Sequence, residues 1–212
     1  MSLCVARLPI GPLETNCYVL TDTENAELAV VIDPAYPDEA LSQAIAPYTV
    51  SDILITHAHF DHIGGLSWLV AQTKARVWLH QAEEGWLQNP ILNLSALFST
   101  TGELISSPPA TNVLQGDDSF SVLGQKVFAY HTPGHTPGHM VYRIGDDVFT
   151  GDLIFNTGVG RTDLPGGSST AMNESLRCTI LTLPDNVRLW PGHGAATTVG
   201  TEREHNPYLT SL

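Results

Sequence analysis

The sequence has few cysteines and few basic residues, and each scarcity excludes a class of protein. Cys4, Cys17 and Cys178 are odd in number and form no CxxC pair, which excludes a disulfide framework and predicts reduced, buried thiols. Nine lysines and arginines stand against 22 aspartates and glutamates, which gives a formal net charge of −13. Because such a chain repels phosphate backbones and anionic lipids, we expect neither nucleic acid nor a membrane as its partner.

Long hydrophobic runs are absent too. No window approaches the roughly 18 unbroken apolar residues of a membrane span, because Asp, Glu, Pro or Gly interrupts every run. The N-terminal segment MSLCVARLPIGPLETN lacks the basic stretch, apolar block and cleavage site of a secretion signal. We therefore expect a cytoplasmic protein.

The composition is that of a globular chain. Of its 212 residues, 42% are hydrophobic and 15% are charged, so enough apolar surface can be buried to offset the entropy of ordering. No Pro/Ser linker, low-complexity tract or shift of composition divides the chain. A single domain over residues 1–212 is predicted, while the oligomeric state leaves no signal in the sequence.

Short apolar runs bounded by turn residues predict two strand-rich halves. The predicted strands of the first half are 17–20, 28–33, 52–56 and 76–80, with helices at 37–48 and 64–73. Those of the second half are 118–123, 125–131, 140–145, 147–152 and 186–190. One helix is predicted at 173–184, before the last of these strands, and another in the C-terminal tail. Within residues 81–111 only QAEEGWLQ favours a helical turn, and we assign no function to residues 81–111 from the sequence. The pattern favours an α/β (α+β) fold with two sheets packed together and helices outside them.

The strongest chemical signal is the motif HAHFDH at positions 57–62, between an apolar run and a Gly-Gly pair. Residues two apart on an extended strand end project to the same side, so His57 and His59 can hold one ion. Asp61 and His62 then turn toward a neighbouring position, which makes a second ion geometrically possible. The alternative is a polar loop of hydrogen-bonded histidines.

Three further strand ends carry groups that suit a metal. In HTPGHTPGH, at 131–139, two Pro-Gly turns hold an imidazole at a fixed position. Asp152 closes the strand VFTGD, where its two carboxylate oxygens can bridge two cations. His193 lies in PGHG directly after the strand 186–190. Four strand ends bearing such groups favour a metal site over four unrelated polar loops.

These motifs, in this order, resemble those of the metallo-β-lactamase superfamily. HTPGHTPGH, FTGD and GRTD are most similar to small single-domain relatives of glyoxalase II, a hydroxyacylglutathione hydrolase. The resemblance implies a four-layer αββα sandwich with the site along one edge of the paired sheets. It also implies two divalent metal ions, zinc in the first place and iron or manganese as alternatives.

The resemblance assigns a role to each ligand residue. It implies that one ion is bound by His57, His59 and His135, and that the other is bound by Asp61, His62 and His193, with Asp152 as the bridge. His131 and His139 do not match family ligands, and we expect His139 to order its loop. Asp33 resembles a family residue that supports the metal loop, although a simple turn residue is the plainer interpretation.

Two bound cations would lower the pKa of water toward about 7, so a metal-bound hydroxide would attack an acyl carbonyl. GxSxG is absent, and no cysteine lies beside a histidine in a motif, so a protein nucleophile is not indicated. A thiol with a pKa of about 8.5 leaves without a general acid, which favours a small-molecule thioester as substrate. We therefore predict a metal-dependent hydrolase, similar to hydroxyacylglutathione hydrolase, with Asp61 and Asp152 in its catalytic centre.

Substrate recognition is less well defined by the sequence. Arg161 in GVGRTDLPGG is a candidate donor to a substrate carboxylate, or else an ordinary loop residue. Two-domain glyoxalase II proteins have Lys and Tyr where this chain has Arg161 and Asp163, so glutathione recognition is in question. The rival functions are an iron-dependent persulfide dioxygenase of the same superfamily, with His57, His135 and Asp152 around one iron, and a noncatalytic metal-binding module.

Overall fold

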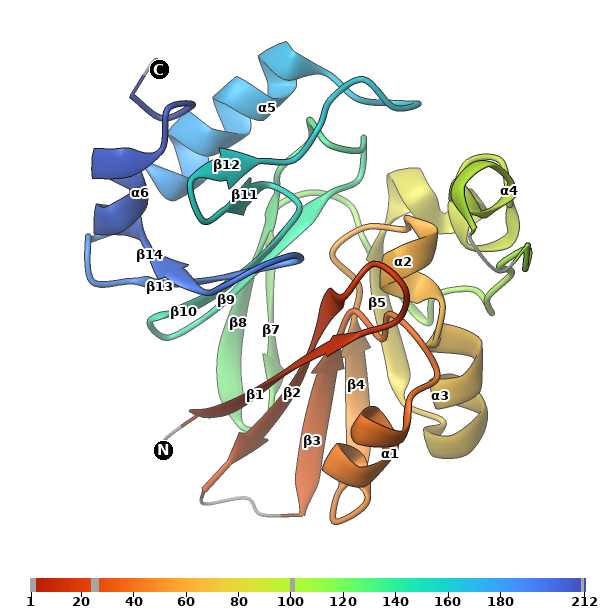
Figure 1. Cartoon of the computed structure of the whole chain (residues 1–212). Coiled ribbons are helices and arrows are strands. Elements are labelled where there is room, and N and C mark those ends of the chain that lie inside the picture. The colour runs from red at the N-terminus through yellow and green to blue at the C-terminus, as the bar shows by residue number, and fades with distance from the viewer. Residues whose placement is uncertain (1–2, 24–26, 100–101, 211) are drawn as a thin grey trace.

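The computed structural model describes residues 3–23, 27–99, 102–210 and 212. Two six-stranded sheets lie face to face, and helices cover the outer side of each (Figure 1). The first sheet is flanked by α1 (Glu39–Ile45) and α3 (Leu66–Thr73), and the second by α5 (Ser169–Ser175) and α6 (Val199–His205). This four-layer αββα sandwich confirms the predicted fold class.

The first sheet is built from the N-terminal half in simple chain order. Its strands are β1 (Leu3–Ile10), β2 (Thr15–Asp22), β3 (Leu28–Ile32), β4 (Thr49–Leu54), β5 (Arg76–His80) and β6 (Asn112–Leu114). β1, β2 and β3 pair antiparallel, whereas β3 to β6 run parallel. Parallel neighbours need crossover connections, and these contain α1, α2 (Phe60–Ile63), α3, the 3₁₀ helix η1 (Gln81–Gln88) and α4 (Ser95–Phe98).

The second sheet has the order β14-β13-β10-β9-β8-β7. Its strands are β7 (Asp118–Val122), β8 (Gln125–His131), β9 (Met140–Ile144), β10 (Asp147–Gly151), β13 (Arg188–Pro191) and β14 (Thr197–Thr198). β10 and β13 pair parallel, so their C-terminal ends lie at the same edge. Between them the chain forms the hairpin β11 (Ile154–Phe155) and β12 (Gly158–Val159), then α5 and the π-helical turn η2 (Leu176–Ile180).

Three buried apolar clusters hold the four layers together. Between the sheets, Leu54 from the first and Tyr142 and Phe149 from the second are fully buried. The outer face of the first sheet packs on α1 and α3, and that of the second packs on α5, η2 and α6. Successive side chains of a strand point to opposite faces, so both faces of each sheet bury apolar residues.

Element boundaries follow local signals. α1 begins after Asp38, whose side chain accepts a hydrogen bond from the Ala40 N–H at 2.7 Å. The helix expected at 173–184 instead begins at Ser169, because the Ser168 hydroxyl caps it, and it continues as a π turn to Ile180. The unassigned stretch 81–111 contains η1 and α4.

The expectation that all three cysteines are buried was wrong for two of them. Cys17 is buried, whereas Cys4 and Cys178, hereafter the two exposed thiols, reach solvent. All three are free, as predicted. Among the described residues, every helix is too short or too polar to span a bilayer.

Candidate metal centre

Loops from both sheets converge at one edge of the sandwich. The segment after β4 carries His57 and His59 and then forms α2, which contains Asp61 and His62. The other sheet contributes a histidine from the β8–β9 loop, an aspartate after β10 and a histidine after β13: His135, Asp152 and His193. The structure thus brings together all seven residues that the sequence predicted as ligands.

The first cluster contains three imidazoles. His59 Nδ1 lies 3.0 Å from His57 Nε2 and 2.9 Å from His135 Nε2. Burial, reinforced by the neighbouring histidines, lowers the pKa of His59 to about 3 and that of His57 well below its usual value. All three rings are buried, so their nitrogens converge where a divalent cation would find its ligands.

Hydrogen bonds fix which nitrogen of each ring faces the centre. The Thr56 hydroxyl donates its proton to Asp33 Oδ2 at 2.6 Å, so it can only accept from His57 Nδ1, at 3.1 Å. His57 Nδ1 therefore carries the ring proton, and His57 Nε2 keeps a free lone pair. His135 Nδ1 lies 2.7 Å from the Arg161 carbonyl, which can only accept. The Nε2 atoms of both rings therefore present lone pairs to the centre.

The second cluster combines a carboxylate with two imidazoles. Asp61 Oδ2 lies 3.2 Å from His193 Nε2 and 3.6 Å from His62 Nε2. Burial opposes ionisation of Asp61, but His62 and His193 lower its pKa to about 2. Burial likewise opposes protonation of His62, but the carboxylates around it raise its pKa well above the usual range. A bound cation would replace these protons as the partner of the carboxylates.

Asp152 lies between the two clusters. Its Oδ1 is 3.4 Å from His62 Nε2, and its Oδ2 is 3.4 Å from His135 Nε2 and 3.8 Å from His193 Nε2. Asp152 Oδ1 and His62 Nε2 are buried and, within the described part of the chain, have no hydrogen-bond partner. Since buried polar atoms almost always have partners, these orphaned atoms fit a cation between them.

A carboxylate behind the centre orients its ligands. Asp33 accepts hydrogen bonds from the Thr56 N–H at 2.8 Å and from the Thr56 hydroxyl, and it lies 2.9 Å from His62 Nδ1. Its φ of 49° lets the chain turn at the end of β3. Asp33 is therefore both a turn residue and a support for the metal loop, although the sequence favoured only the former.

His139 orders the backbone, as expected, and is not part of either cluster. Its Nε2 accepts from the Asp152 N–H at 3.1 Å, and its Nδ1 lies 2.9 Å from the Thr132 hydroxyl. His131 and His80 stack on one another with ring centroids 4.0 Å apart. His205 is exposed on α6.

Glu83 is a residue that the sequence did not single out. It is fully buried, and its two oxygens accept from the Ala58 N–H at 2.5 Å and the Gly138 N–H at 2.8 Å. The carboxylate thereby joins the HAHFDH loop to the HTPGHTPGH loop. Gly138 is required there, because a Cβ would approach Glu83 Cγ to 2.9 Å. No local signal separates Glu83 from its exposed neighbour Glu84.

The His193 loop is held by β2 of the opposite sheet, another feature that the sequence did not reveal. Asn16 Nδ2 donates to the carbonyls of Pro191 and Gly194 at 2.8 and 2.9 Å, and the Tyr18 hydroxyl donates to Pro191 at 2.6 Å. The Thr15 hydroxyl donates to Asp61 Oδ2 at 3.0 Å. Their partners are more than 40 residues away, beyond the reach of any local pattern.

A cavity of about 290 Å³ opens over the centre. It is lined by Leu13, His59, Phe60, Asp61, Leu94, Phe98, His135, Asp152, Arg161 and Leu164. Arg161 makes a two-point pair with Asp163, at 2.7 and 2.8 Å. The predicted substrate residue thus borders the cavity, but its guanidinium already has an acidic partner.

The comparison with known proteins agrees with this geometry. The family model of the metallo-beta-lactamase superfamily matches residues 10–193. The chain belongs to that superfamily. It is 36% identical to the probable metallo-hydrolase YqgX of Bacillus subtilis, over 97% of both chains. It is 30% identical to the hydroxyacylglutathione hydrolase GloC of Haemophilus influenzae, over 96% of this chain and 97% of that protein.

Solved structures of the superfamily superpose over nearly the whole chain. The B3 metallo-beta-lactamase BLEG-1 is 38% identical with a TM-score of 0.92, covering 98% of this chain and 100% of that one. TTHA1623, solved in a di-iron-bound form, is 35% identical with a TM-score of 0.82, covering 97% and 100%. Superfamily membership and the histidine-rich site together support a metal-dependent hydrolase.

Proposed function

We propose that this chain hydrolyses thioesters at a centre of two divalent cations. One cation would be held by His57, His59 and His135, the other by Asp61, His62 and His193, with Asp152 between them. The observation that carries this proposal is the orphaned pair His62 Nε2 and Asp152 Oδ1, buried at 3.4 Å from one another. When bound, the two cations would supply activated water and polarise an acyl carbonyl.

The chain's own residues prepare the ligands and exclude competing chemistry. Asp33, Thr56 and the Arg161 carbonyl keep the imidazoles oriented, so little reorganisation accompanies binding. No residue lining the described part of the cavity is a serine, a cysteine or a lysine. The carboxylates and imidazoles of the described lining are assigned to the cations, which leaves water as the nucleophile that the site can use.

The leaving group decides between acyl substrates. Amide nitrogen must be protonated as it leaves, whereas a thiol with a pKa of about 8.5 leaves as the thiolate. The carboxylates that line the described cavity are Asp61 and Asp152, and both are assigned to the cations, so neither is free to donate a proton. Thioesters therefore suit this site, in keeping with the similarity to the hydroxyacylglutathione hydrolase GloC.

Zinc is our proposal for both positions, because imidazole and carboxylate donors suit it. The same donors accept iron and manganese, and the similar TTHA1623 was solved in a di-iron-bound form. The metal content of protein purified without added metal distinguishes these cations.

The test combines metal analysis with three assays. Protein stripped by a chelator is reloaded with zinc, iron or manganese, and hydrolysis of the lactoyl thioesters of glutathione and of N-acetylcysteamine is followed by thiol release. Nitrocefin hydrolysis and oxygen uptake on glutathione persulfide are measured on the same samples. We expect two ions per chain and thioester hydrolysis as the main activity. Oxygen uptake with one iron per chain, dominant nitrocefin hydrolysis, or no turnover at all would each refute the proposal.

A matched pair of variants assigns the activity to this centre. Asp152→Asn removes the negative charge between the two clusters, so we expect fewer bound ions per chain. Because a metal ligand is lost, we also expect kcat to fall at least about a hundredfold. Asp146→Asn makes the same change at an exposed hairpin turn and should leave both unchanged. Full turnover in Asp152→Asn would contradict the assignment.

A further inference from the structure

The cavity above the metal centre has apolar walls. Its apolar lining residues are Leu13, Leu94, Phe98 and Leu164, together with Phe60. Leu13 and Phe98 remain 45% and 47% exposed, so large apolar surfaces stand open at its mouth. Exposed apolar groups that rim a cleft mark the place where an apolar ligand part is buried.

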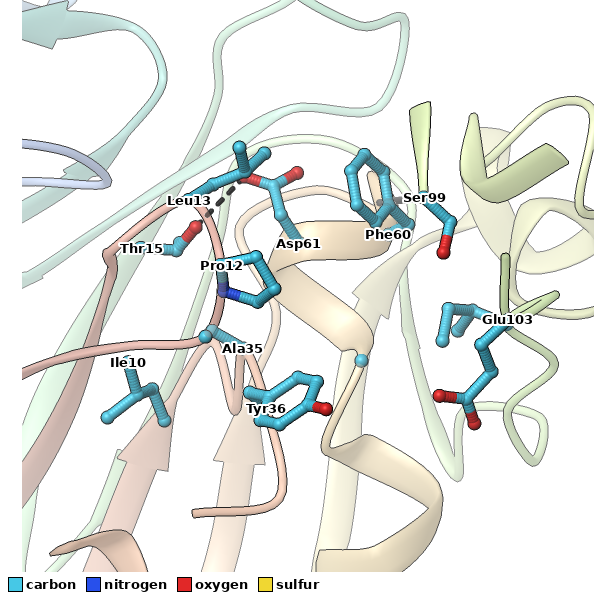
Figure 2. A pocket seen from close by; sticks show the side chains of 13 residues that line it. Ile10, Pro12, Leu13, Thr15, Ala35, Tyr36, Phe60, Asp61, Ser99 and Glu103 are labelled. Atoms are coloured by element: carbon cyan, nitrogen blue, oxygen red, sulfur yellow. Dashed lines mark hydrogen bonds between the residues drawn. The ribbon is translucent and has the colours of Figure 1, made fainter. Parts of the chain in front are cut away.

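A second, narrower hollow of about 30 Å³ adjoins this cavity and shares Leu13, Phe60 and Asp61 with it. Figure 2 shows Pro12 and Leu13 along one side and Phe60, Ser99 and Glu103 along the other, with Ile10 and Tyr36 beneath. Its size admits a group of about two water volumes. Its lining is mostly apolar, its charged members are acidic, and the lining residues described include no lysine or arginine.

Hydrogen bonds hold the segments that carry the apolar lining residues Phe60, Leu94 and Phe98 in fixed positions. Asn93 is fully buried, and its amide donates to the carbonyls of Trp86 and Ile105 at 3.1 and 2.9 Å. Its Oδ1 accepts the Ser95 N–H at 3.0 Å, at the start of α4, and its carbonyl accepts the Phe60 N–H at 2.8 Å. The walls bearing Leu94, Phe98 and Phe60 are therefore tied together and prepared for a ligand.

Away from the metal centre, the cavity offers an anionic ligand little positive charge. Arg161 is the one basic lining residue of the described cavity, apart from its histidines, and Asp163 accepts from its Nε–H and from one Nη2–H, along one edge of the guanidinium. Glu103 lines the narrower hollow, and the net charge of the chain is −13. A glutathione conjugate carries two carboxylates and one ammonium group, and the one arginine that could meet a carboxylate in the described cavity already shares its charge with Asp163.

We infer, building on the thioester hydrolysis proposed above, that this site selects thioesters with an apolar acyl arm and an uncharged thiol arm over glutathione conjugates. The apolar arm lies along Leu13, Phe98 and Leu164, and the scissile carbonyl lies over the metal centre. Selectivity arises because the apolar arm leaves water while the carboxylates of glutathione find no partner.

The decisive experiment is a binding comparison that does not depend on catalysis. Two thioethers that cannot be hydrolysed, S-hexyl-N-acetylcysteamine and S-hexylglutathione, share one apolar arm and differ in charge. Calorimetry on the metal-loaded protein should show at least about tenfold tighter binding of the neutral analogue. Equal affinities, or tighter binding of S-hexylglutathione, would overturn the inference.

Three variants test the residues involved. Phe98→Ala should weaken binding of both thioethers by about tenfold, as expected for a lost aromatic contact. Phe128→Ala, at an exposed position of β8, is the matched control and should change neither. Asp163→Asn releases Arg161 and should strengthen binding of S-hexylglutathione severalfold. If Phe98→Ala and Phe128→Ala changed the affinity for the thioethers equally, the contact between the ligand and Phe98 would be refuted. If Asp163→Asn left the affinity for S-hexylglutathione unaltered, the role of the Arg161–Asp163 ion pair would be refuted.

Turnover separates this inference from the proposed function. Thioesters of one acyl group with glutathione and with N-acetylcysteamine are compared by kcat/KM. A higher value for the neutral thioester supports both conclusions. A higher value for the glutathione thioester refutes the substrate class alone, and the absence of thioester turnover with metal bound refutes the proposed function.

Discussion

The carboxylate of Glu83 provides the sharpest test of how the two metal loops are held. In Glu83→Gln the amide oxygen can accept one N–H, from Ala58 or Gly138, while the other N–H faces an amide NH₂ group. One hydrogen bond to a charged acceptor, worth about 1.5–3 kcal/mol, is lost, and a buried donor is left unsatisfied at a further cost of about 1–3 kcal/mol.

The neutral amide recovers part of this loss, because burial penalises the charged form and raises the pKa of Glu83. We therefore expect the free energy of unfolding to fall by about 2–4 kcal/mol. For a chain of this size that lowers Tm by about 5–15 °C. Because both loops carry metal ligands, we also expect metal affinity to fall about 10–100-fold.

The assay pairs this variant with its neighbour. Glu84→Gln makes the same chemical change on the exposed side of η1 and should alter stability by less than about 0.5 kcal/mol. Urea unfolding gives the stability of each protein, and competition with a chromogenic chelator gives its zinc affinity. Equal stability and equal zinc affinity of the two variants would refute the tie between the loops.

Three further predictions concern other parts of the molecule. Asp33→Asn should lower zinc affinity about 10–100-fold while the protein stays folded by circular dichroism, because His62 loses its carboxylate partner; wild-type affinity would contradict this. Burial and the neighbouring His131 lower the pKa of His80 from 6.5 to about 4. The unfolded chain then binds a proton that the folded chain does not, so stability declines as pH falls from about 6.5 to about 4. His80→Gln should show a shallower decline in urea unfolding between these pH values, and parallel curves would contradict the assignment. Finally, a thiol reagent should label the two exposed thiols in the native protein and Cys17 only after unfolding, since burial raises the pKa of that thiol; rapid native labelling of all three would contradict its burial.

The sequence by itself determined the fold class and the composition of the metal centre. Alternating apolar runs identify strands, because side chains of a strand alternate between two faces whatever the partner. HAHFDH, Asp152 and His193 could be recognised because each follows a strand end, and strand ends of packed sheets gather at one edge. The choice of His135 among the three histidines of its loop came from the resemblance to the superfamily. These are signals carried by a few consecutive residues.

Only the tertiary structure decided which polar residues hold that centre in place. Glu83 and Glu84 are adjacent and chemically identical, and one is buried between two loops while the other faces solvent. Asn16 supports the loop of His193 from the opposite sheet, 175 residues or more along the chain. The tertiary structure likewise decided that Cys4 and Cys178 are exposed while Cys17 is buried. Such roles depend on contacts between segments remote in sequence, and their energy resides in burial and hydrogen bonds that exist only once the sheets have packed.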